Sequence, residues 1–376
     1  MSPEDKMLYR IAFSMIRGCN LGLASKMLSI LESEETFFYL SDNDLRNTLN
    51  VKGSITSSSY RSELLEKAKR EMDFIMRSGI KTLYFTDEVF PKRLLSCEDG
   101  PVMLYALGNA NLNASKILSV VGTRRATAYG VEMTRSIVKD LADEYGDSIL
   151  IVSGLAYGID VASHRAALEA GIPTVAITAH PLNTIYPAQH RSVAVEMLKY
   201  NGGLVTEYPT CSVVHRSNFL QRNRIIAGIA DATLVSESDE KGGSLVTASI
   251  AMAYNRDVFA IPGRITDTFS RGTNRLIAHN RAALVRDAGD IIDAMRWERK
   301  PREGDQATLN LELSPEQISC LECIRDNPDF TVNEISRTLG ISYSALTNVL
   351  FELEMSDLIV TIPGNRYILT ALASNI

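Results

Sequence analysis

The sequence predicts an α/β protein with an extended Rossmann-like parallel sheet, flanked by a small N-terminal helical domain and a C-terminal winged helix. Between residues 117 and 285, short unbroken apolar runs alternate with stretches in which apolar residues recur every three or four positions. Such runs are typical of parallel strands buried on both faces, and the stretches between them of the helices that cover the sheet. Beyond a polar stretch, residues 313–376 show a pattern of three helices and a hairpin, which predicts the winged helix.

Length and composition predict several domains. The 376 residues exceed one typical domain, and an apolar content of 45% supports a sizeable core. The breaks in pattern give four segments: a helical domain at residues 1–70, the sheet domain at 71–297, a linker at 298–312 and the winged helix at 313–376.

Charge and cysteine content limit the possible functions. A formal net charge of −6 argues against a basic coat over the whole surface, so any DNA site has to be a local patch. The five cysteines lack metal-ligand spacing, which predicts reduced thiols and no metal site; Cys320 and Cys323 are expected on one face of a helix. No signal peptide and no apolar run of membrane length is visible, so we expect a cytoplasmic protein without a membrane partner.

The N-terminal segment is predicted to be helical. Two apolar stripes, within residues 8–15 and 21–31, each recur at helical spacing. Gly18 and Gly22 make a weak version of the glycine-rich hairpin of a helix-hairpin-helix DNA module, and purely structural helices are the favoured alternative. Further along we expect a polar linker, a charged helix and two short strands that extend or flank the main sheet, at residues 54–59, 61–78, 84–85 and 103–106.

The main alternation then follows in order. Strands are expected at residues 117–121, 149–152, 174–177, 204–207, 232–235, 258–261 and 283–285. Helices are expected near residues 133–142, 161–168, 193–200, 221–230, 245–254 and 273–279. A loop is expected at residues 215–219, before the fourth of these helices.

The predicted winged helix is acidic. From residue 313 onward there are eight acidic and three basic residues, a net charge of −5. The start of the would-be recognition helix, residues 342–345, has no lysine or arginine. Because phosphate neutralisation drives most DNA affinity, we expect this module to contact protein or regulate rather than to bind duplex DNA alone.

Three glycine-rich turns follow strands of the predicted sheet. The first holds Gly122, Thr123, Arg124 and Arg125, the second runs from Ser153 and Gly154 through Gly158, and the third holds Gly243 and Ser244. Ligands of such sheets collect at the C-terminal ends of the strands, and free amides at a helix start favour anions. The arginines add fork-shaped donors that suit phosphate oxygens. These turns therefore predict a phosphorylated ligand, unless the glycines only make tight turns.

A polar and aromatic cluster precedes the third turn. It contains Asn218, Phe219, Arg222, Asn223 and Arg224. These are residue types that grip phosphates and stack on bases in single-strand readers. Residues two apart on a helix do not face one another, so both arginines can reach one phosphate only at a loop-to-helix junction. The alternatives are that one arginine is a buried ion-pair partner and that Phe219 belongs to the core.

Catalytic groups are scarce. The glycines at 154 and 158 are too close for a Walker loop and no lysine follows, and the dinucleotide G-x-G-x-x-G is absent at Gly122. Gly243 and Ser244 are not followed by the glutamate of some nucleotide-cleaving enzymes. Asp160 and His164 lie one helical turn apart and could act as a general-base pair, although capping and a structural contact are the commoner explanations. We expect no catalysis, no cofactor and no metal.

Taken together, the motifs resemble those of the DNA-processing protein A (DprA, also called Smf) family. The residues that carry the resemblance are Val-Gly-Thr-Arg at 121–124, Ser-Gly-Leu-Ala-Tyr-Gly-Ile-Asp at 153–160, Ile-Tyr-Pro at 185–187, Arg-Asn-Arg-Ile-Ile-Ala-Gly at 222–228, Gly-Ser-Leu-Val-Thr-Ala at 243–248 and Val-Phe-Ala-Ile-Pro-Gly at 258–263. The family usually has serine at the position of Thr123, and a basic residue often stands where this chain has Ala188. The N-terminal segment resembles the family's sterile-alpha-motif-like domain, and the tail resembles the winged helix of many members.

The resemblance implies a non-enzymatic protein that binds and protects incoming single-stranded DNA, forms a homodimer and loads the RecA recombinase during natural transformation. It implies a DNA site that includes Gly122, Thr123, Arg124, Ser153, Gly154, Arg222, Asn223, Arg224 and Ser244. Two alternatives remain: a nucleotide-binding enzyme such as a nucleoside-phosphate hydrolase, and a transcriptional regulator with a ligand-sensing sheet.

Overall fold

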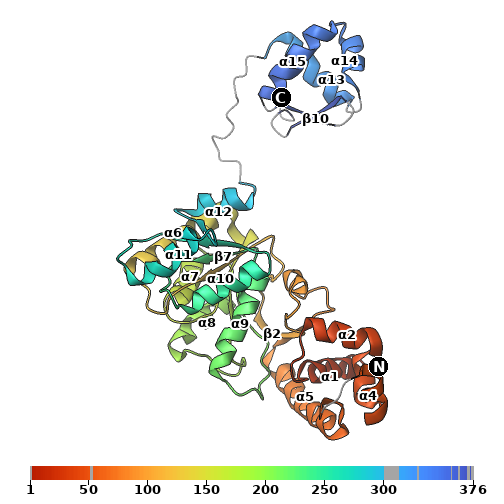
Figure 1. Cartoon of the computed structure of the whole chain (residues 1–376), viewed down its shortest axis with the longest axis vertical. Helices are drawn as coiled ribbons and strands as arrows, with labels where there is room; N and C mark the ends of the chain where they lie inside the picture. The colour runs from red at the N-terminus through yellow and green to blue at the C-terminus, as the bar shows by residue number, and fades with distance from the viewer. Residues whose placement is uncertain are drawn as a thin grey trace. The chain divides into compact units, whose positions relative to one another are not determined.

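The computed structural model describes residues 2–50, 54–299, 313–327, 330–356, 358–362, 365–370 and 373. The chain divides into two compact units, Met1–Lys300 and Pro301–Ile376 (Figure 1). No helix in the described ranges is long and apolar enough to cross a membrane.

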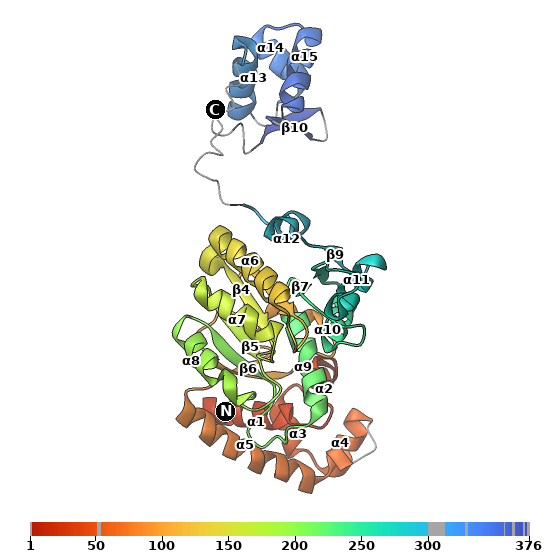
Figure 2. The same cartoon turned by 90° about the vertical axis from the view of Figure 1, so that its left-hand side faces the viewer.

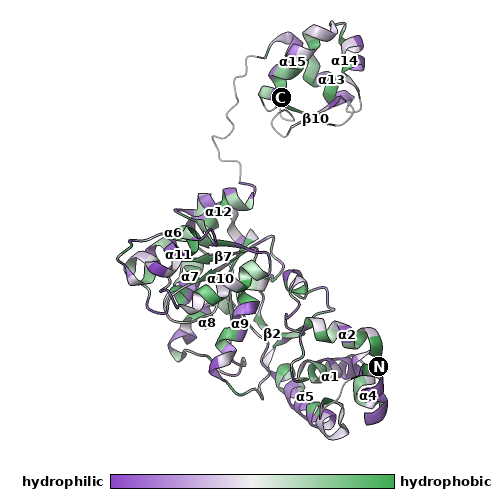
Figure 3. Cartoon of the chain, viewed as in Figure 1, coloured by the Kyte–Doolittle hydropathy of each residue, from purple (hydrophilic) through white to green (hydrophobic). Residues whose placement is uncertain are grey.

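The first unit begins with a cluster of helices. They are α1 (Pro3–Ser14), α2 (Leu21–Leu31), α3 (Glu34–Tyr39), α4 (Asp42–Leu49) and α5 (Ser58–Ser78). Each begins after a serine or asparagine whose side chain accepts a hydrogen bond from a backbone amide of the first turn, which is why these short helices start where they do. Their shared core includes Phe13 and Phe37, and also Tyr84 and Tyr105 from the edge of the sheet. In Figure 3 much of α4 and α5 is hydrophilic, in contrast to the apolar strands.

The prediction of a polar linker at residues 54–59 is wrong in part. Residues Ser54–Thr56 form a 3-10 turn, and Ser57 caps α5 through a hydrogen bond from the amide of Tyr60. A run of serines favours a helix start as well as a linker, because the hydroxyl satisfies a free amide. The predicted domain limits remain a prediction; the limit at residue 70 would fall within α5.

A nine-stranded sheet organises the rest of the first unit. Its order is β1-β2-β6-β5-β4-β3-β7-β8-β9. The strands are β1 (Lys81–Tyr84), β2 (Met103–Gly108), β3 (Lys116–Val121), β4 (Ile149–Ser153), β5 (Thr174–Ile177), β6 (Gly203–Thr206), β7 (Ala232–Val235), β8 (Asp257–Ala260) and β9 (Ala283–Leu284). Strands β3 to β9 are parallel, whereas β2 joins β6 in antiparallel orientation and β1 joins β2 likewise. This confirms the predicted Rossmann-like sheet and its extension by two short strands.

Helices cover both faces of this sheet (Figure 2). On one face, α9 (Arg216–Ile229) and α10 (Gly243–Ala253) pack on residues such as Val121 and Val152. The other face carries α6 (Ala128–Tyr145), α7 (Ile159–Glu169) and α12 (Ala288–Met295), which pack on neighbours such as Val120 and Ile151, and α8 (Arg191–Lys199), which packs on Ala176 and Leu204. Alternate residues of a strand point to opposite faces. Because both faces are covered, every residue of β4 is buried and the strands have unbroken apolar sequences. The helix α11 (Arg271–Ala278) precedes β9.

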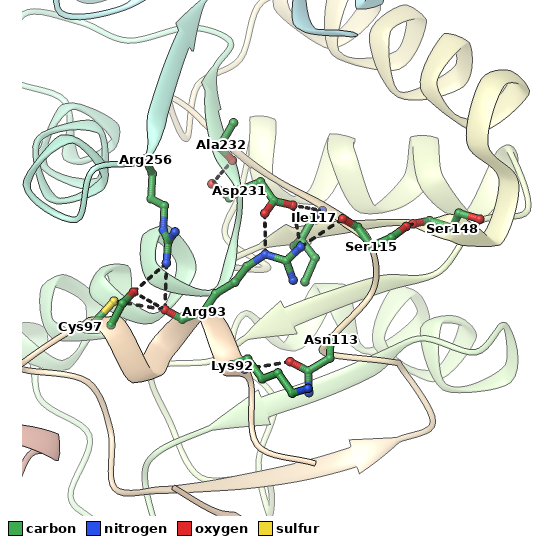
Figure 4. A network of polar contacts seen from close by, with 12 residues as sticks. Lys92, Arg93, Cys97, Asn113, Ser115, Ile117, Ser148, Asp231, Ala232 and Arg256 are labelled. Atoms are coloured by element: carbon green, nitrogen blue, oxygen red, sulfur yellow. Dashed lines mark hydrogen bonds and ion pairs between the residues drawn. The ribbon is translucent and has the colours of Figure 1, made fainter. Parts of the chain in front are cut away.

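A polar network holds the N-terminal ends of the neighbouring strands β3 and β7 (Figure 4). The guanidinium of Arg93 donates two hydrogen bonds to Asp231, of 2.6 and 2.8 Å, and the same carboxylate accepts from the amide of Ile117 at 2.8 Å. Arg256 donates to the carbonyl of Arg93 at 2.8 Å. The network ties the loop before β2 to the starts of β3 and β7, and leaves the opposite ends of these strands free for a site.

The second unit is a winged helix. It contains α13 (Pro315–Asp326), α14 (Val332–Leu339) and α15 (Tyr343–Met355), followed by the antiparallel pair β10 (Ile359–Ile362) and β11 (Arg366–Leu369). Cys320 and Cys323 are both buried in its core beside Leu346 and Leu353, which confirms that they share one face of a helix. The linker predicted at residues 298–312 lies almost wholly outside the described residues.

Candidate nucleic-acid interface

The topology of the sheet creates a crevice between β3 and β7. These strands are parallel neighbours, but the chain leaves β3 toward β4 on one side and β7 toward β8 on the other. The connecting loops therefore diverge above their C-terminal ends, which is where ligands bind in open α/β sheets. A cavity of about 260 Å³ lies there, which we call the switch-point cavity.

Eight residues that were singled out from the sequence line the switch-point cavity: Gly122, Thr123, Arg124, Phe219, Arg222, Asn223, Gly243 and Ser244. They come from three segments that are far apart in the chain, which are the loop after β3, the helix α9 and the start of α10. Sequence reasoning missed several other lining residues, among them Asp160, Leu220 and Thr247. Asp160 was considered only as a helix cap or as half of a general-base pair, Thr247 was noted only as part of a motif, and no sequence signal marks Leu220.

The first glycine turn is occupied by a carboxylate of the protein itself. The buried side chain of Glu237, just after β7, accepts hydrogen bonds from the amide and the hydroxyl of Thr127, the residue that caps α6. The amide of Thr123 donates to the carbonyl of Glu237 at 2.8 Å. The start of α6 therefore already holds an anionic group, and what this turn offers to a ligand is the exposed side chain of Arg124.

The second turn also holds a carboxylate, although α7 itself has no side-chain cap and its first amide, that of Ile159, donates to the carbonyl of Thr123 at 3.2 Å. Asp160, in the first turn of α7, accepts a hydrogen bond from the amide of Ala156 at 3.4 Å. Burial raises the pKa of Asp160, and the positive charge of Arg222 opposes this rise. Gly158 has a φ of +76°, and a Cβ atom there would collide with the carbonyl of Thr123. This glycine is needed for the close approach of two loops, which is the structural alternative considered for these turns.

The third turn differs from the first two. The helix α10 begins after Gly242 with no side chain capping it. Gly242, Gly243 and Ser244 all line the switch-point cavity. An uncapped helix start has free amides and a partial positive charge, which together favour an anion. The start of α7 also lacks a side-chain cap, but its amides at Ile159 and Val161 donate to the carbonyls of Thr123 and Ala156. The start of α10 is therefore the one that we assign to a ligand phosphate.

Arg222 crosses the floor of the cavity rather than reaching out of it. Its side chain is buried, and one terminal nitrogen donates to the carbonyls of Gly154, at 2.8 Å, and of Ile177. A Cβ atom at Gly154 would collide with this guanidinium, so glycine is required for the contact. Arg222 thus connects the ends of β4 and β5 and places a positive charge beneath the cavity, close to Asp160.

The prediction of a loop at residues 215–219 is wrong, because α9 begins at Arg216. Phe219, Arg222, Asn223 and Ile226 are spaced by three and four along this helix, and all of them line the cavity. Arg224 points elsewhere and pairs with Glu207. The two arginines therefore do not converge on one phosphate, and the ion-pair alternative describes Arg224, although the pair is only partly buried. Burial raises the pKa of Glu207, and Arg224 opposes this rise.

The remaining predicted residues lie beside the cavity without lining it. The hydroxyl of Ser153 is buried and donates to the carbonyl of Val120 at 2.6 Å. Asn218 is buried, and its amide donates to the carbonyl of Ala179 at 3.4 Å. The guanidinium of Arg125 lies 5.2 Å from the centre of the Phe269 ring.

An aromatic pair lies beside the cavity: Phe219 lines it, and Tyr186 contacts Phe219. The rings of Phe219 and Tyr186 meet edge to face with centroids 5.6 Å apart, and the guanidinium of Arg124 lies 5.8 Å from the Phe219 centroid. Tyr186 is about half exposed. This pair offers a surface on which a base can stack, with a cation beside it. Sequence reasoning noted Tyr186 only as part of a motif; its nearness to Phe219 depends on the fold.

The Asp160 and His164 pair is not arranged for proton transfer. His164 is fully buried, and its Nδ1 lies 2.7 Å from the hydroxyl of Thr174. Burial, followed by the nearby charge of Arg222, lowers the pKa of His164 to about 3. No group of three or more histidine, cysteine, aspartate or glutamate side chains in the described ranges could hold a metal ion.

A larger cavity, of about 650 Å³, lies between α2 and the end of α10. It is lined by Glu98 and Asp99 with a single lysine, Lys26. Two carboxylates facing one ammonium make this cavity a poor site for a phosphate.

Comparison with known sequences identifies one family for the sheet domain and another for the winged helix. The model of the DNA recombination-mediator protein A family matches residues 81–296, and that of the MarR family matches residues 313–363. A putative DNA processing protein DprA from Mycobacterium tuberculosis is 34% identical over 325 residues, which are 82% of this chain and 82% of the relative. Protein Smf from Escherichia coli is 33% identical over 283 residues, or 74% of each chain.

Solved structures agree with this assignment. DNA processing protein A from Streptococcus pneumoniae matches with a TM-score of 0.63 and 28% identity, over 78% of this chain and 98% of that one. The protein of the same name from Helicobacter pylori, whose structure concerns its single-stranded DNA binding mode, matches with a TM-score of 0.52 and 27% identity, over 59% of this chain and 97% of that one.

Proposed function

This chain belongs to the DNA recombination-mediator protein A family, and from that premise we propose that it binds single-stranded DNA in the switch-point cavity as a non-enzymatic recombination mediator. The proposed role is to protect incoming single strands and load RecA during natural transformation, as a homodimer in the cytoplasm. Family membership supports this role, and the Helicobacter pylori relative supports the choice of a single-stranded ligand.

One arrangement carries the proposal: an uncapped helix start, an exposed arginine and an aromatic pair around a single cavity. A phosphate at the start of α10 would receive backbone amide hydrogen bonds. Arg124 lines the same cavity and can add two charge-assisted hydrogen bonds. Phe219 and Tyr186 offer faces to a base, and stacking suits any base because each has a π face.

The arrangement favours a single strand over a duplex. In duplex DNA the bases are stacked on one another and their faces are not accessible, whereas a single strand can place a base on Phe219. A cavity of about 260 Å³ at a loop-lined crevice accommodates single nucleotide units rather than the width of a double helix.

A competition series tests this function. A labelled single strand is bound to the full chain, and unlabelled single strand, duplex of the same sequence and mononucleotides are added in turn. We expect the single strand to compete at least about tenfold more strongly than either alternative, because only it offers both linked phosphates and free bases. Displacement by duplex but not by single strand would overturn the proposal, and turnover of the mononucleotide would favour an enzyme.

The winged helix has a different proposed role, which is to contact a protein. The start of its helix α15, at Ser342, Tyr343, Ser344 and Ala345, lacks basic side chains, and the exposed face of α15 carries Phe351 and Met355. Apolar side chains suit a protein surface better than a phosphate backbone.

Deleting residues 313–376 is therefore expected to leave affinity for a single strand within about threefold, because the removed segment is net acidic. Anisotropy titrations of the truncated and full-length proteins with the same oligonucleotide measure this. A loss of tenfold or more would show that the winged helix contributes directly to DNA binding.

A further inference from the structure

A second cavity adjoins the switch-point cavity on the face of the sheet covered by α6 and α7. It has a volume of about 450 Å³, and we call it the arginine groove. Arg124 lines both cavities, so they meet at this side chain. Three further arginines line the groove, which are Arg125, Arg135 and Arg165, together with one acidic residue, Glu169.

The acidic residue of the groove is already paired. The Nε of Arg135 donates to Glu169 at 2.9 Å, and Arg135 also lies 4.0 Å from Glu132. Arg165 is exposed, and no ion pair is found for it within the described part of the chain. The groove therefore keeps an excess of positive charge after its internal pair is counted, and Arg165 and Arg124 are the side chains best placed to meet an outside anion.

The shape of the groove follows from small residues along α7. Gly158, Ala162 and Ala166 are four residues apart, so they lie on one face of the helix, and all three line the groove. Their short side chains line a channel at the surface of α7, which elsewhere packs closely against α6. Arg165 and Glu169 stand on the next row of the same helix and border this channel.

We propose that the arginine groove binds the phosphates of the nucleotides next to those held in the switch-point cavity. This inference rests on the proposed function and extends it. Single-strand-binding proteins combine a stacking surface with a positively charged groove that follows the backbone. Here the aromatic pair at the switch-point cavity supplies the stacking surface. The arginine groove, which meets this cavity at Arg124, supplies the positive charge along the backbone. The strand leaves the cavity past Arg124 and runs along α7 to Arg165.

Oligonucleotides of different length distinguish binding in the switch-point cavity from binding in the arginine groove. The experiment uses the full chain and compares Arg165→Ala with wild type on oligothymidylates of about four and about twelve nucleotides, lengths at the lower and upper parts of the usual range for single-strand sites. The short oligonucleotide occupies the switch-point cavity, and the long one also reaches the groove. Arg77→Ala is the matched control, because Arg77 is an exposed arginine on α5 that lines neither cavity.

We expect Arg165→Ala to weaken binding of the long oligonucleotide by about three- to tenfold, as for loss of one solvent-exposed hydrogen bond of ordinary strength, and of the short one by less than about twofold. Glu169→Gln should have the opposite effect and strengthen binding of the long oligonucleotide, because it removes the carboxylate of the groove and frees Arg135. A purely structural role for this pair predicts no gain.

The outcomes separate this inference from the proposed function. If wild type binds neither oligonucleotide, the proposed function fails and the groove with it. If wild type binds both and Arg165→Ala behaves like Arg77→Ala at both lengths, the groove has another occupant, such as an acidic protein surface, and only this inference is overturned. An equal loss at both lengths would also contradict it, because the groove would then not be a separate part of the site.

Discussion

Replacing Arg124 by alanine is expected to weaken single-strand binding by about 1–3 kcal/mol, roughly a five- to 150-fold rise in Kd, and to leave the melting temperature almost unchanged. The side chain is exposed, lines both cavities and lies beside the Phe219 ring. Its loss removes hydrogen bonds that form only with the phosphate, so the free protein loses little.

Arg124→Lys provides the matched comparison. Lysine keeps the charge but not the planar fork, so we expect an affinity between those of wild type and Arg124→Ala. Anisotropy titrations and thermal melting of the three proteins are measured together. Unchanged affinity in a well-folded Arg124→Ala variant would remove this residue from the site, and a large drop in melting temperature would identify it as a structural residue instead.

Arg222→Ala is expected to act on stability, with a loss of about 3–5 kcal/mol in the free energy of unfolding. The buried guanidinium donates to the carbonyls of Gly154 and Ile177. Alanine would leave both carbonyls without this donor, and Asp160 buried without its nearby positive charge. Removing one member of a buried hydrogen-bonded group costs more free energy of unfolding than the intact group contributes. The reason is that the remaining members stay buried without a partner.

Denaturant unfolding followed by Trp297 fluorescence measures this effect. Trp297 is the single tryptophan of the chain and packs against the core on the α6 side of the sheet. Arg165→Ala serves as the control, because an exposed arginine without an ion-pair partner in the described ranges should change stability little. If Arg222→Ala remains as stable as this control and loses DNA binding, Arg222 acts as a phosphate ligand rather than as a support for the cavity floor.

The order and type of the sheet elements could be predicted because their signal is local. Apolar runs such as residues 117–121 and 149–152 can be buried on both faces only within a covered sheet, so each strand is marked in its own sequence. The error at residues 215–219 has the same origin. The start of α9 carries few apolar residues, and without an apolar stripe its helical turns resemble a loop.

The site was predictable in composition but not in geometry. Residue types that bind phosphate could be found in the sequence, but which helix starts were free could not. Glu237 follows β7 and occupies the start of α6, more than a hundred residues away in the chain. No pattern in either segment shows this contact. In the same way, the nearness of Tyr186 to Phe219 and the burial of Arg222 arise only when separate strands place their loops at one edge.

The salt dependence of binding tests the central claim, that the switch-point cavity grips backbone phosphates through Arg124. Association constants of wild type and Arg124→Ala for one oligonucleotide are measured over a range of salt concentrations and plotted as logarithms. Each phosphate neutralised by the protein contributes about −0.7 to the slope for a single strand. We expect a steep negative slope for wild type and a slope shallower by about 0.7 for the variant. Equal slopes for the two proteins, or a flat response of wild type, would contradict the claim.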